Sequence, residues 1–399
     1  MATAARKLGA RNIASRREYQ PYLEAAWGLK NHWYPALFSH ELPDRIVKGV
    51  TIAGHEIALR RAKGKVYSLA DRCAHRGVRM SKKSMCLTDE HLTCWYHGFT
   101  YGLEDGVLKT ILASPDDAQI GRVKIRTYPT YERNGIIFVF VGDENYRPIP
   151  PIEADLPIRI VDDPTGNPVG YLLDDNVFVR GIHRTGNSNW RLAVENGFDP
   201  GHVLIHYDNQ IVAATGMALI LGAEPMDDRA IEIIDQPDGP KGIMNMYNRL
   251  ESYKPIYRND LVNIETPGKL QYYVRTSMFV PGVLLVEHWP AANWAQYEFY
   301  VPIDDRTHEY WELIVGHCNS DDDRREAEFR YKNFFEPLGL YDFNNRDLFA
   351  REAMEDFYRD MDGWSEEQLC KTDAIVVGWR KLAARFNRGI QEPPPGHGG

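Results

Sequence analysis

The spacing of apolar and polar positions divides the chain into two parts that differ in secondary structure. Before residue 150, short β-type runs alternate with turn dipeptides, of which Ala53-Gly54, Lys63-Gly64 and Asn134-Gly135 are the clearest. The expected strands are residues 50–52, 56–59, 65–69 and 136–141. Short strands joined by tight turns predict a small antiparallel β domain, to which we assign residues 31–150.

The second part of the chain mixes strand-like and helical patterns, and we assign residues 151–390 to it. The expected strands are residues 283–286 and 297–301, and the expected helices are residues 322–335 and 347–360. A further stripe at helical spacing is more typical of core packing than of a cofactor site, and consists of Ile375, Trp379, Leu382 and Phe386. The pattern therefore predicts a larger α+β domain.

The two ends of the chain differ from both domains. Residues 1–30 have helical character, and we expect them to pack on the larger domain. Residues 391–399 are rich in Pro and Gly and are expected to form a disordered tail.

Composition excludes several classes of function. The chain has 399 residues, enough for two domains with sizeable cores, and a net charge of −9 without a long basic run, which argues against a nucleic-acid partner. It contains no run of about 18 apolar residues, so we expect no membrane span. Its five cysteines show no disulfide framework, as expected of a protein in a reducing cytoplasm.

Two short motifs carry the clearest chemical signal. Cys73-Ala74-His75-Arg76-Gly77 and Cys94-Trp95-Tyr96-His97-Gly98 each offer one thiolate and one imidazole. Such a set can hold one zinc ion or a Rieske [2Fe-2S] cluster, in which the cysteines bind one iron and the histidines the other. Zinc sites usually group their ligands as C-x-x-C and H-x-x-x-H, whereas alternation within each loop favours the cluster. Cys86 lies between the loops without a His at motif spacing, and we expect an ordinary thiol.

A second metal site is indicated further along the chain. His202 and His206 are four residues apart, which would place both imidazoles on one face of a helix, with Asp199 one turn earlier. Two imidazoles and a carboxylate form the facial triad of mononuclear Fe(II) oxygenases. By itself, an H-x-x-x-H pair is more often an ordinary pair of histidines. Glu195 and Asp199 are the nearest carboxylates, and Asp199, followed by Pro200, is also a reasonable helix N-cap.

In order and flanking residues, these motifs resemble the Rieske non-haem iron ring-hydroxylating oxygenases. The two cysteine loops match that family's Rieske motifs, and residues 189–206 resemble its mononuclear iron segment. Matching segments along nearly the whole chain are similar to the carbazole-dioxygenase branch of the family, and they include residues 31–35, 118–122, 281–284 and 379–383. This resemblance implies that the larger domain is built on a central antiparallel sheet of the helix-grip, START-like kind.

The resemblance also implies the metal ligands. In the family, the ligating carboxylate lies far downstream of the histidines, and Asp347 holds that position here, with Asp342 and Glu352 as rivals. One [2Fe-2S] cluster and one Fe(II) per chain are implied. The cluster ligands would be Cys73, His75, Cys94 and His97, and the Fe(II) ligands would be His202, His206 and Asp347.

A catalytic role for Asp199 follows from the same resemblance. Its carboxylate would join the iron ligand His202 to the cluster ligand His97 of a neighbouring subunit, since a carboxylate can fix the tautomer of a metal-bound imidazole. The alternative is an aspartate that only caps or braces a helix.

The resemblance further implies which residues bind the substrate. Gly197 stands where a backbone carbonyl accepts the substrate N–H, and a glycine lets a flat ligand approach the backbone closely. Trp289 stands where the carbazole-type relatives carry Phe, which adds bulk. The other implied lining residues are Val203, Leu219, Leu284, Val286, Gln296, Glu298 and Phe343. For the aliphatic members, ordinary core packing is an equally good explanation.

The implied activity is that of the terminal oxygenase component of a multicomponent aromatic-ring dioxygenase. A ferredoxin, fed by an NAD(P)H reductase, would supply electrons, and O2 would be used to dioxygenate carbazole or a related tricyclic heteroaromatic at an angular position. The resemblance also implies a homotrimer. Two alternatives stay open. One is a Rieske monooxygenase or oxidative demethylase of an N-heterocycle, and the other is a pure Rieske electron-transfer protein, with about two irons per chain instead of about three.

Overall fold

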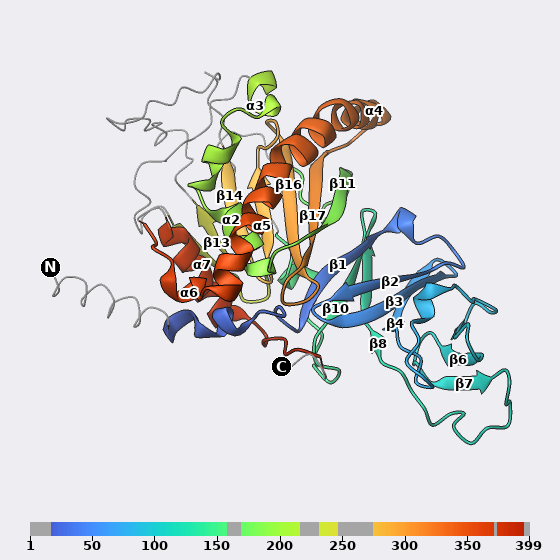
Figure 1. Cartoon of the computed structure of the whole chain (residues 1–399). Coiled ribbons are helices and arrows are strands. Elements are labelled where there is room, and N and C mark those ends of the chain that lie inside the picture. Colours follow the sequence, from blue (N-terminus) through green and yellow to red (C-terminus); the bar gives the residue numbers. More distant parts are fainter. Residues whose placement is uncertain (1–16, 158–168, 216–230, 246–273, 371–372, 395–399) are drawn as a thin grey trace, which may run out of the picture. The chain divides into compact units, whose positions relative to one another are not determined.

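The computed structural model describes residues 17–157, 169–215, 231–245, 274–370 and 373–394 (Figure 1). The chain divides into two compact units, with boundaries at residues 28/29, 152/153 and 390/391. The small unit lies between residues 29 and 152 and includes the described residues after 390, and the large unit contains the rest.

The small unit consists of three antiparallel sheets with the strand orders β1-β10-β9, β2-β3-β4-β8 and β5-β6-β7. The strands are β1 His32–Phe38, β2 Val47–Ile52, β3 His55–Ala62, β4 Lys65–Ala70, β5 His91–Thr93, β6 Phe99–Gly102, β7 Leu108–Ile111, β8 Thr127–Tyr128, β9 Thr130–Arg133 and β10 Ile136–Val141, and the short 3-10 helices are η1 Ser39–Glu41 and η2 Met80–Lys82. The three predicted turns connect β2 to β3, β3 to β4 and β9 to β10. Ala53, Lys63 and Asn134 have the positive φ that tight hairpins require.

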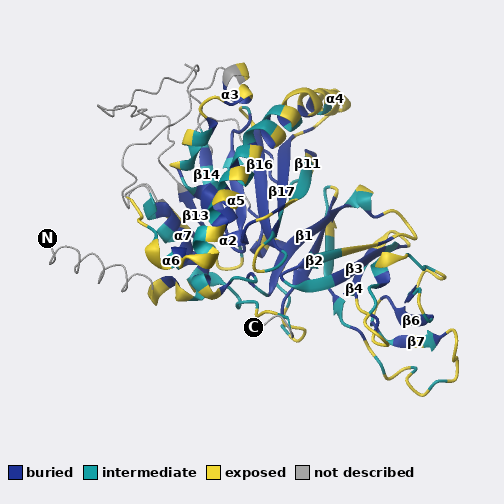
Figure 2. Cartoon of the chain, viewed as in Figure 1, coloured by how far each residue is buried: buried dark blue, intermediate teal, exposed yellow. Residues whose placement is uncertain are grey.

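The large unit is built on a seven-stranded antiparallel sheet with the order β11-β17-β16-β15-β14-β13-β12. Its strands are β11 Val177–Gly186, β12 Ile231–Asp235, β13 Lys241–Asn245, β14 Arg275–Phe279, β15 Val283–Glu287, β16 Trp294–Pro302 and β17 His308–His317. All nine residues of β16 are buried, and the central strands form the dark core of Figure 2. This architecture confirms the predicted fold class, a small antiparallel β domain and a larger α+β domain with a central antiparallel sheet.

Helices of the large unit cover one face of this sheet, where α2, α5 and α7 lie in front of the strands in Figure 1. The helical segments are η3 Ile152–Ala154, α2 Trp190–Phe198, η4 His202–His206, α3 Gln210–Thr215, α4 Asp321–Arg330, η6 Tyr331–Phe343, α5 Asn344–Asp360, α6 Gly363–Glu366 and α7 Ala374–Phe386. Two of them differ from the expectation. The helix expected at 322–335 continues beyond α4 as a π-helix, η6, and η4 is a 3-10 turn instead of an α-helix. No helix in the described parts of the chain is long and apolar enough to cross a membrane.

The two ends of the chain can be placed in part. Residues 17–24 are helical, and Tyr22, fully buried, packs its ring against Trp190 and Trp379 of the large unit. In the small unit, the Gln391 side chain lies 3.2 Å from His55 Nε2. The remainder of the predicted tail, residues 395–399, and residues 1–16 lie outside the described residues.

Candidate metal centres and active site

The two cysteine loops of the small unit repeat one backbone arrangement. In the first loop, Gly77 N donates to Cys73 O (2.8 Å) and Cys73 N donates to Val78 O (3.0 Å). In the second, Gly98 N donates to Cys94 O (3.0 Å) and Cys94 N donates to the carbonyl of the residue after Gly98 (2.7 Å). Both glycines have positive φ, which side-chain-bearing residues rarely adopt. The same tight turn therefore presents one Cys and one His from each loop.

The four side chains of the two loops converge. His75 Nδ1 and His97 Nδ1 are 3.1 Å apart, and a hydrogen bond from Cys94 lowers the pKa of the Cys73 thiol to about 6. Both cysteines are buried, whereas His75 is exposed. The Tyr101 hydroxyl lies 3.3 Å from Cys73 Sγ. Two buried thiols, one exposed imidazole and one half-buried imidazole fit a [2Fe-2S] cluster with its histidine edge nearer the surface.

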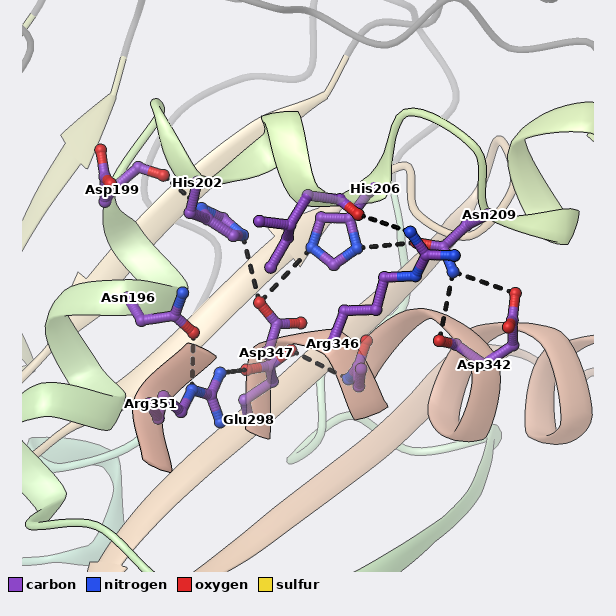
Figure 3. A network of polar contacts seen from close by, with 12 residues as sticks. Asn196, Asp199, His202, His206, Asn209, Glu298, Asp342, Arg346, Asp347 and Arg351 are labelled. Atoms are coloured by element: carbon purple, nitrogen blue, oxygen red, sulfur yellow. Dashed lines mark hydrogen bonds and ion pairs between the residues drawn. The ribbon is translucent and has the colours of Figure 1, made fainter. Parts of the chain in front are cut away.

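In the large unit, the structure brings together the second predicted set of ligands (Figure 3). Asp347, in the first turn of α5, places Oδ1 3.5 Å from His202 Nε2 and 3.4 Å from His206 Nε2, and the ligand atoms of all three lie within 4.8 Å of one another. The two histidines lie on η4, more than 130 positions away along the chain. One carboxylate and two imidazoles that converge on one point match the 2-His-1-carboxylate facial triad.

Unpaired polar atoms indicate what this site could hold. His206 Nε2 and Asp347 Oδ1 are buried without a hydrogen-bond partner in the structure. Buried polar groups nearly always have a hydrogen-bond partner. A metal ion bound between these two atoms would provide a partner for both of them. Burial raises the pKa of Asp347, but the imidazoles of His206 and His202 and the Arg351 guanidinium outweigh it and hold that pKa well below its usual value. The carboxylate is therefore ionised and ready to bind a cation.

The other carboxylates that the sequence left open lie elsewhere. Asp342 Oδ2 accepts hydrogen bonds from Asn209 Nδ2 and from Gln210 N, both at 3.0 Å. Glu352 Oε1 accepts from the backbone N–H of Asn187 at 3.0 Å. Glu195 forms a buried ion pair with an arginine of α7 at 2.6 Å.

The contacts of Asp199 differ from the predicted one, in which its carboxylate contacts the imidazole of His202. It ends α2, and its Oδ1 accepts the backbone N–H of Gly201 at 2.7 Å. His202 Nδ1 contacts the backbone carbonyl of Asp199 and not the carboxylate. Burial raises the pKa of Asp199. The carboxylate borders a cavity of about 310 Å³, which His202, Asp373 and Arg380 also line.

The substrate candidates gather on one face of the sheet. In the antiparallel register, Leu284 is opposite Glu298 and Val286 is opposite Gln296, so all four side chains point to the same side. Gly197 of α2 lies against this face, since a Cβ there would be 3.4 Å from Leu284 and 1.8 Å from the hydroxyl of Tyr300, two positions along β16 from Glu298.

Two aromatic residues connect this face to the histidines. Phe343 stacks on His206 with ring centroids 3.6 Å apart, and Trp289 packs on Phe343 at 4.8 Å. Val203 lies on η4 beside His202, and Leu219 lies outside the described residues. None of the described substrate candidates lines the cavity beside Asp199.

Three buried residues of this site, Asn196, Asn209 and Arg351, were not predicted from the sequence. Arg351, one helical turn after Asp347, donates through Nε to Asn196 Oδ1 at 2.6 Å. Asn209 Oδ1 faces His206 Nδ1 at 2.9 Å. For Asn209 the only sequence signal is its position three residues after His206, which on its own does not distinguish it from other polar residues.

Both metal-binding arrangements occur together in one class of enzyme, the Rieske non-haem iron oxygenases, in which a cluster passes electrons to a mononuclear iron. The comparisons with known proteins agree. A model of the Rieske [2Fe-2S] domain matches residues 32–129, and a model described as homotrimeric ring hydroxylase matches residues 140–391. The chain belongs to the homotrimeric ring hydroxylase family.

Individual relatives are similar over nearly the whole chain. The terminal oxygenase component of carbazole 1,9a-dioxygenase from Metapseudomonas resinovorans is 40% identical over 94% of both chains. A solved 2-oxoquinoline 8-monooxygenase component is 48% identical, with a TM-score of 0.90 over 95% of this chain and 91% of its own. A reduced complex between oxygenase and ferredoxin in carbazole 1,9a-dioxygenase gives a TM-score of 0.84 at 39% identity over 96% of both chains. The chain is thus a ring-hydroxylating oxygenase with one [2Fe-2S] cluster and one mononuclear iron, and not a pure electron carrier.

Proposed function

We propose that the chain is the terminal oxygenase component of a multicomponent dioxygenase that attacks carbazole or a related tricyclic heteroaromatic at an angular position. Both atoms of O2 would be added to the ring carbon bonded to nitrogen and to its neighbour, with two electrons and two protons. The relatives that act on carbazole support this substrate class. The observation that carries the proposal is the position of Gly197, which lies five residues before His202 and packs closely against Leu284 and Tyr300 of the sheet.

The carbonyl of Gly197 is available to a ligand for a structural reason. It lies in the last turn of α2, and in a continuing helix it would accept the N–H of Gly201. That N–H instead donates to the carboxylate of Asp199. Gly197 O therefore remains an acceptor for an N–H such as that of a carbazole ring.

The metal ligands are part of the proposal. We assign Cys73, His75, Cys94 and His97 to the cluster, and His202, His206 and Asp347 to the mononuclear iron. Once bound, that iron supplies the open coordination positions at which O2 is activated. The protein holds the flat substrate beside it with Trp289, Phe343 and the side chains of Leu284, Val286, Gln296 and Glu298, with Val203 at the edge and Leu219 as a further candidate.

Electron delivery is proposed by analogy with the relatives solved as complexes with ferredoxin. A ferredoxin fed by an NAD(P)H reductase would reduce the cluster at its exposed histidine edge. In the trimer, Asp199 would then connect His202, whose Nδ1 contacts the Asp199 backbone carbonyl, with His97 of the neighbouring subunit, which the carboxylate bordering the cavity would contact. We place the protein in the cytoplasm, because its cysteines form no disulfide framework.

A second candidate is monohydroxylation of a smaller N-heterocycle. It is favoured by the 48% identity to a 2-oxoquinoline 8-monooxygenase component and by Trp289, whose large side chain packs on Phe343. A bicyclic substrate needs less room than a tricyclic one.

Product analysis distinguishes the two. The purified oxygenase, reduced through a ferredoxin and its reductase, is supplied with carbazole or 2-oxoquinoline under ¹⁸O2. We expect carbazole to give an aminobiphenyl-diol with two labelled oxygens. A single labelled hydroxyl on 2-oxoquinoline, with carbazole untouched, would establish the second candidate instead.

A further inference from the structure

The histidine pair of the proposed iron site is held in two different ways. His202 is partly exposed, and its Nδ1 contacts a backbone carbonyl only three residues earlier in the chain. His206 is fully buried, and its Nδ1 lies 2.9 Å from Asn209 Oδ1. Asn209 in turn contacts Asp342, 133 positions away. Both histidines face Asp347, but His206 is also connected to the segment that carries it through the side chains of Asn209 and Asp342.

The orientation of the Asn209 amide follows from its partners. Its Nδ2 donates to the Oδ2 of Asp342 at 3.0 Å and to the backbone carbonyl of the same residue at 3.2 Å (Figure 3). Both are pure acceptors, so the amide must turn its NH2 end toward Asp342 and its oxygen toward His206. That oxygen can only accept. His206 must therefore carry its proton on Nδ1, which leaves the lone pair of Nε2 free on the side of Asp347.

Residues at the end of η6 and at the start of α5 hold the turn that carries His206. Phe343 and Asp347, four residues apart, face the imidazole, the first by stacking on it at 3.6 Å and the second through its carboxylate. Asp342 and Arg346, also four residues apart, hold the backbone around it. Asp342 accepts the N–H of the residue after Asn209, and Arg346 donates to the carbonyl before His206 at 2.9 Å.

We propose that Asp342 is a positioning residue for the mononuclear iron, and that it acts through Asn209 to fix the tautomer and ring orientation of His206. This inference rests on the proposed iron site. It gives Asp342, which the sequence offered only as a rival ligand, a different role at the same centre. Carboxylates and amides that orient a metal-bound imidazole typically change metal affinity by about 10–100-fold when they are removed.

The test measures how fast iron leaves the protein. Holoenzyme trimer is mixed with a ferrous chelator, and loss of the mononuclear iron is followed while the visible spectrum of the Rieske cluster reports that the small unit is intact. We expect Asp342→Ala and Asn209→Ala to lose iron about 10–100-fold faster than the parent enzyme. Asp342→Asn keeps an acceptor oxygen for Asn209 and should stay within about threefold. Glu352→Gln, which changes a carboxylate of α5 without contact to the histidines, is the matched control and should release iron at the parent rate.

A double variant shows whether the two residues act in series. Asn209→Ala combined with Asp342→Ala should lose iron more slowly than the product of the two single effects predicts, because the main effect of Asp342 passes through the amide and its contact with Gln210 N is separate. The parent release rate in Asp342→Ala, or additive effects in the double variant, would overturn the proposal. If Asp342→Ala does not assemble, Asn209→Ala, which keeps the Gln210 contact of Asp342, decides alone.

If the proposed iron site itself were wrong, the experiment would give a different result from the one expected if only the positioning role of Asp342 were wrong. His206→Ala should lack the chelatable iron entirely. If the parent enzyme also holds none beyond the cluster, both the proposed site and this inference are wrong. If His206→Ala abolishes the iron but Asn209→Ala and Asp342→Ala leave its release unchanged, the site stands and the positioning role is wrong. The electron paramagnetic resonance spectrum of the nitric oxide complex gives a second readout, since a reoriented imidazole should change its rhombicity in Asn209→Ala and not in Glu352→Gln.

Discussion

Phe343 lies flat against His206, with ring centroids 3.6 Å apart and ring planes 6° apart. Trp289 packs on the same phenylalanine at 4.8 Å, and its indole N–H donates to Gln296 Oε1 at 2.9 Å. Gln296 in turn donates to Glu298 at 2.6 Å. A continuous chain of contacts therefore runs from a metal-ligand candidate to the residues of the proposed pocket, and it fixes the position of Trp289, the largest of their side chains.

Trp289 should limit the size of the substrate. Trp289→Phe removes the indole and its hydrogen bond but keeps a ring against Phe343, and we expect kcat/KM for tricyclic substrates to rise relative to bicyclic ones by roughly tenfold, with the iron content unchanged. Trp294→Phe is the matched control, because Trp294 packs on Phe178 and Phe335 instead. Product profiles from both variants provide the measurement, and an unchanged profile in Trp289→Phe would place this residue outside the pocket.

The two metal sites should be lost independently. Asp347→Ala, like His202→Ala or His206→Ala, should remove one iron per chain and all turnover while the cluster spectrum persists, because the ligands are separate. Iron and acid-labile sulfide analysis of the purified variants gives the answer. Glu352→Ala serves as the control, and full activity in Asp347→Ala would mean that another carboxylate binds the iron.

Tyr101 should tune the cluster. Its hydroxyl lies 3.3 Å from Cys73 Sγ, and a hydrogen bond to a cluster sulfur favours the reduced, more negative state. At about 1 kcal/mol for one hydrogen bond, Tyr101→Phe should lower the reduction potential by roughly 40 mV. Tyr67→Phe, whose hydroxyl contacts Glu104 instead, should leave the potential unchanged. A redox titration followed by visible spectroscopy measures both, and equal shifts in the two variants would argue against the sulfur contact.

Asp199 should control electron transfer between subunits. An amide presents a donor where the carboxylate presents only acceptors, so Asp199→Asn should slow oxidation of the reduced cluster by roughly 100-fold or more with substrate and O2 present. Single-turnover spectroscopy of the trimer follows this reaction. Asp373→Asn changes another carboxylate of the same cavity and should react at the parent rate. Reoxidation of Asp199→Asn at the parent rate would exclude the bridge.

Acid should destabilise the large unit through His308. This residue is fully buried, and burial followed by the positive charge of Arg351 lowers its pKa from 6.5 to about 3. A histidine with a depressed folded-state pKa binds its proton more readily when unfolded, so its contribution to stability is complete above pH 6.5 and is lost as the pH falls from 6.5 toward 3. The loss at pH 5 should be about 2 kcal/mol.

The measurement is the urea midpoint of unfolding at pH 7 and pH 5. His308→Gln should show a smaller difference between the two pH values than the parent protein, since the variant has no group to protonate at this position. The same pH dependence in both proteins would assign the acid sensitivity to other residues.

Several features of the protein are determined by local sequence. The strands of the small unit follow from alternating runs and from turn dipeptides at Ala53, Lys63 and Asn134, whose positive φ is a property of the turn itself. The two cysteine loops are also local, since each closes through hydrogen bonds between residues four and five positions apart. The type of metal centre could therefore be predicted from ligand types and spacing.

Tertiary structure decides what depends on distant contacts. Nothing near His206 in the sequence selects Asp347 over Asp342 or Glu352, because the choice is made by the packing of α5 against η4. The same holds for Asn209, whose partner is 133 positions away. The π-helical geometry of η6 and the 3-10 geometry of η4 were likewise not predicted from the sequence pattern. The sequence by itself determined which chemical groups are present. Only the fold decided which of them lie in contact, because side chains of segments far apart in the sequence come within contact distance only when the folded sheet brings those segments together.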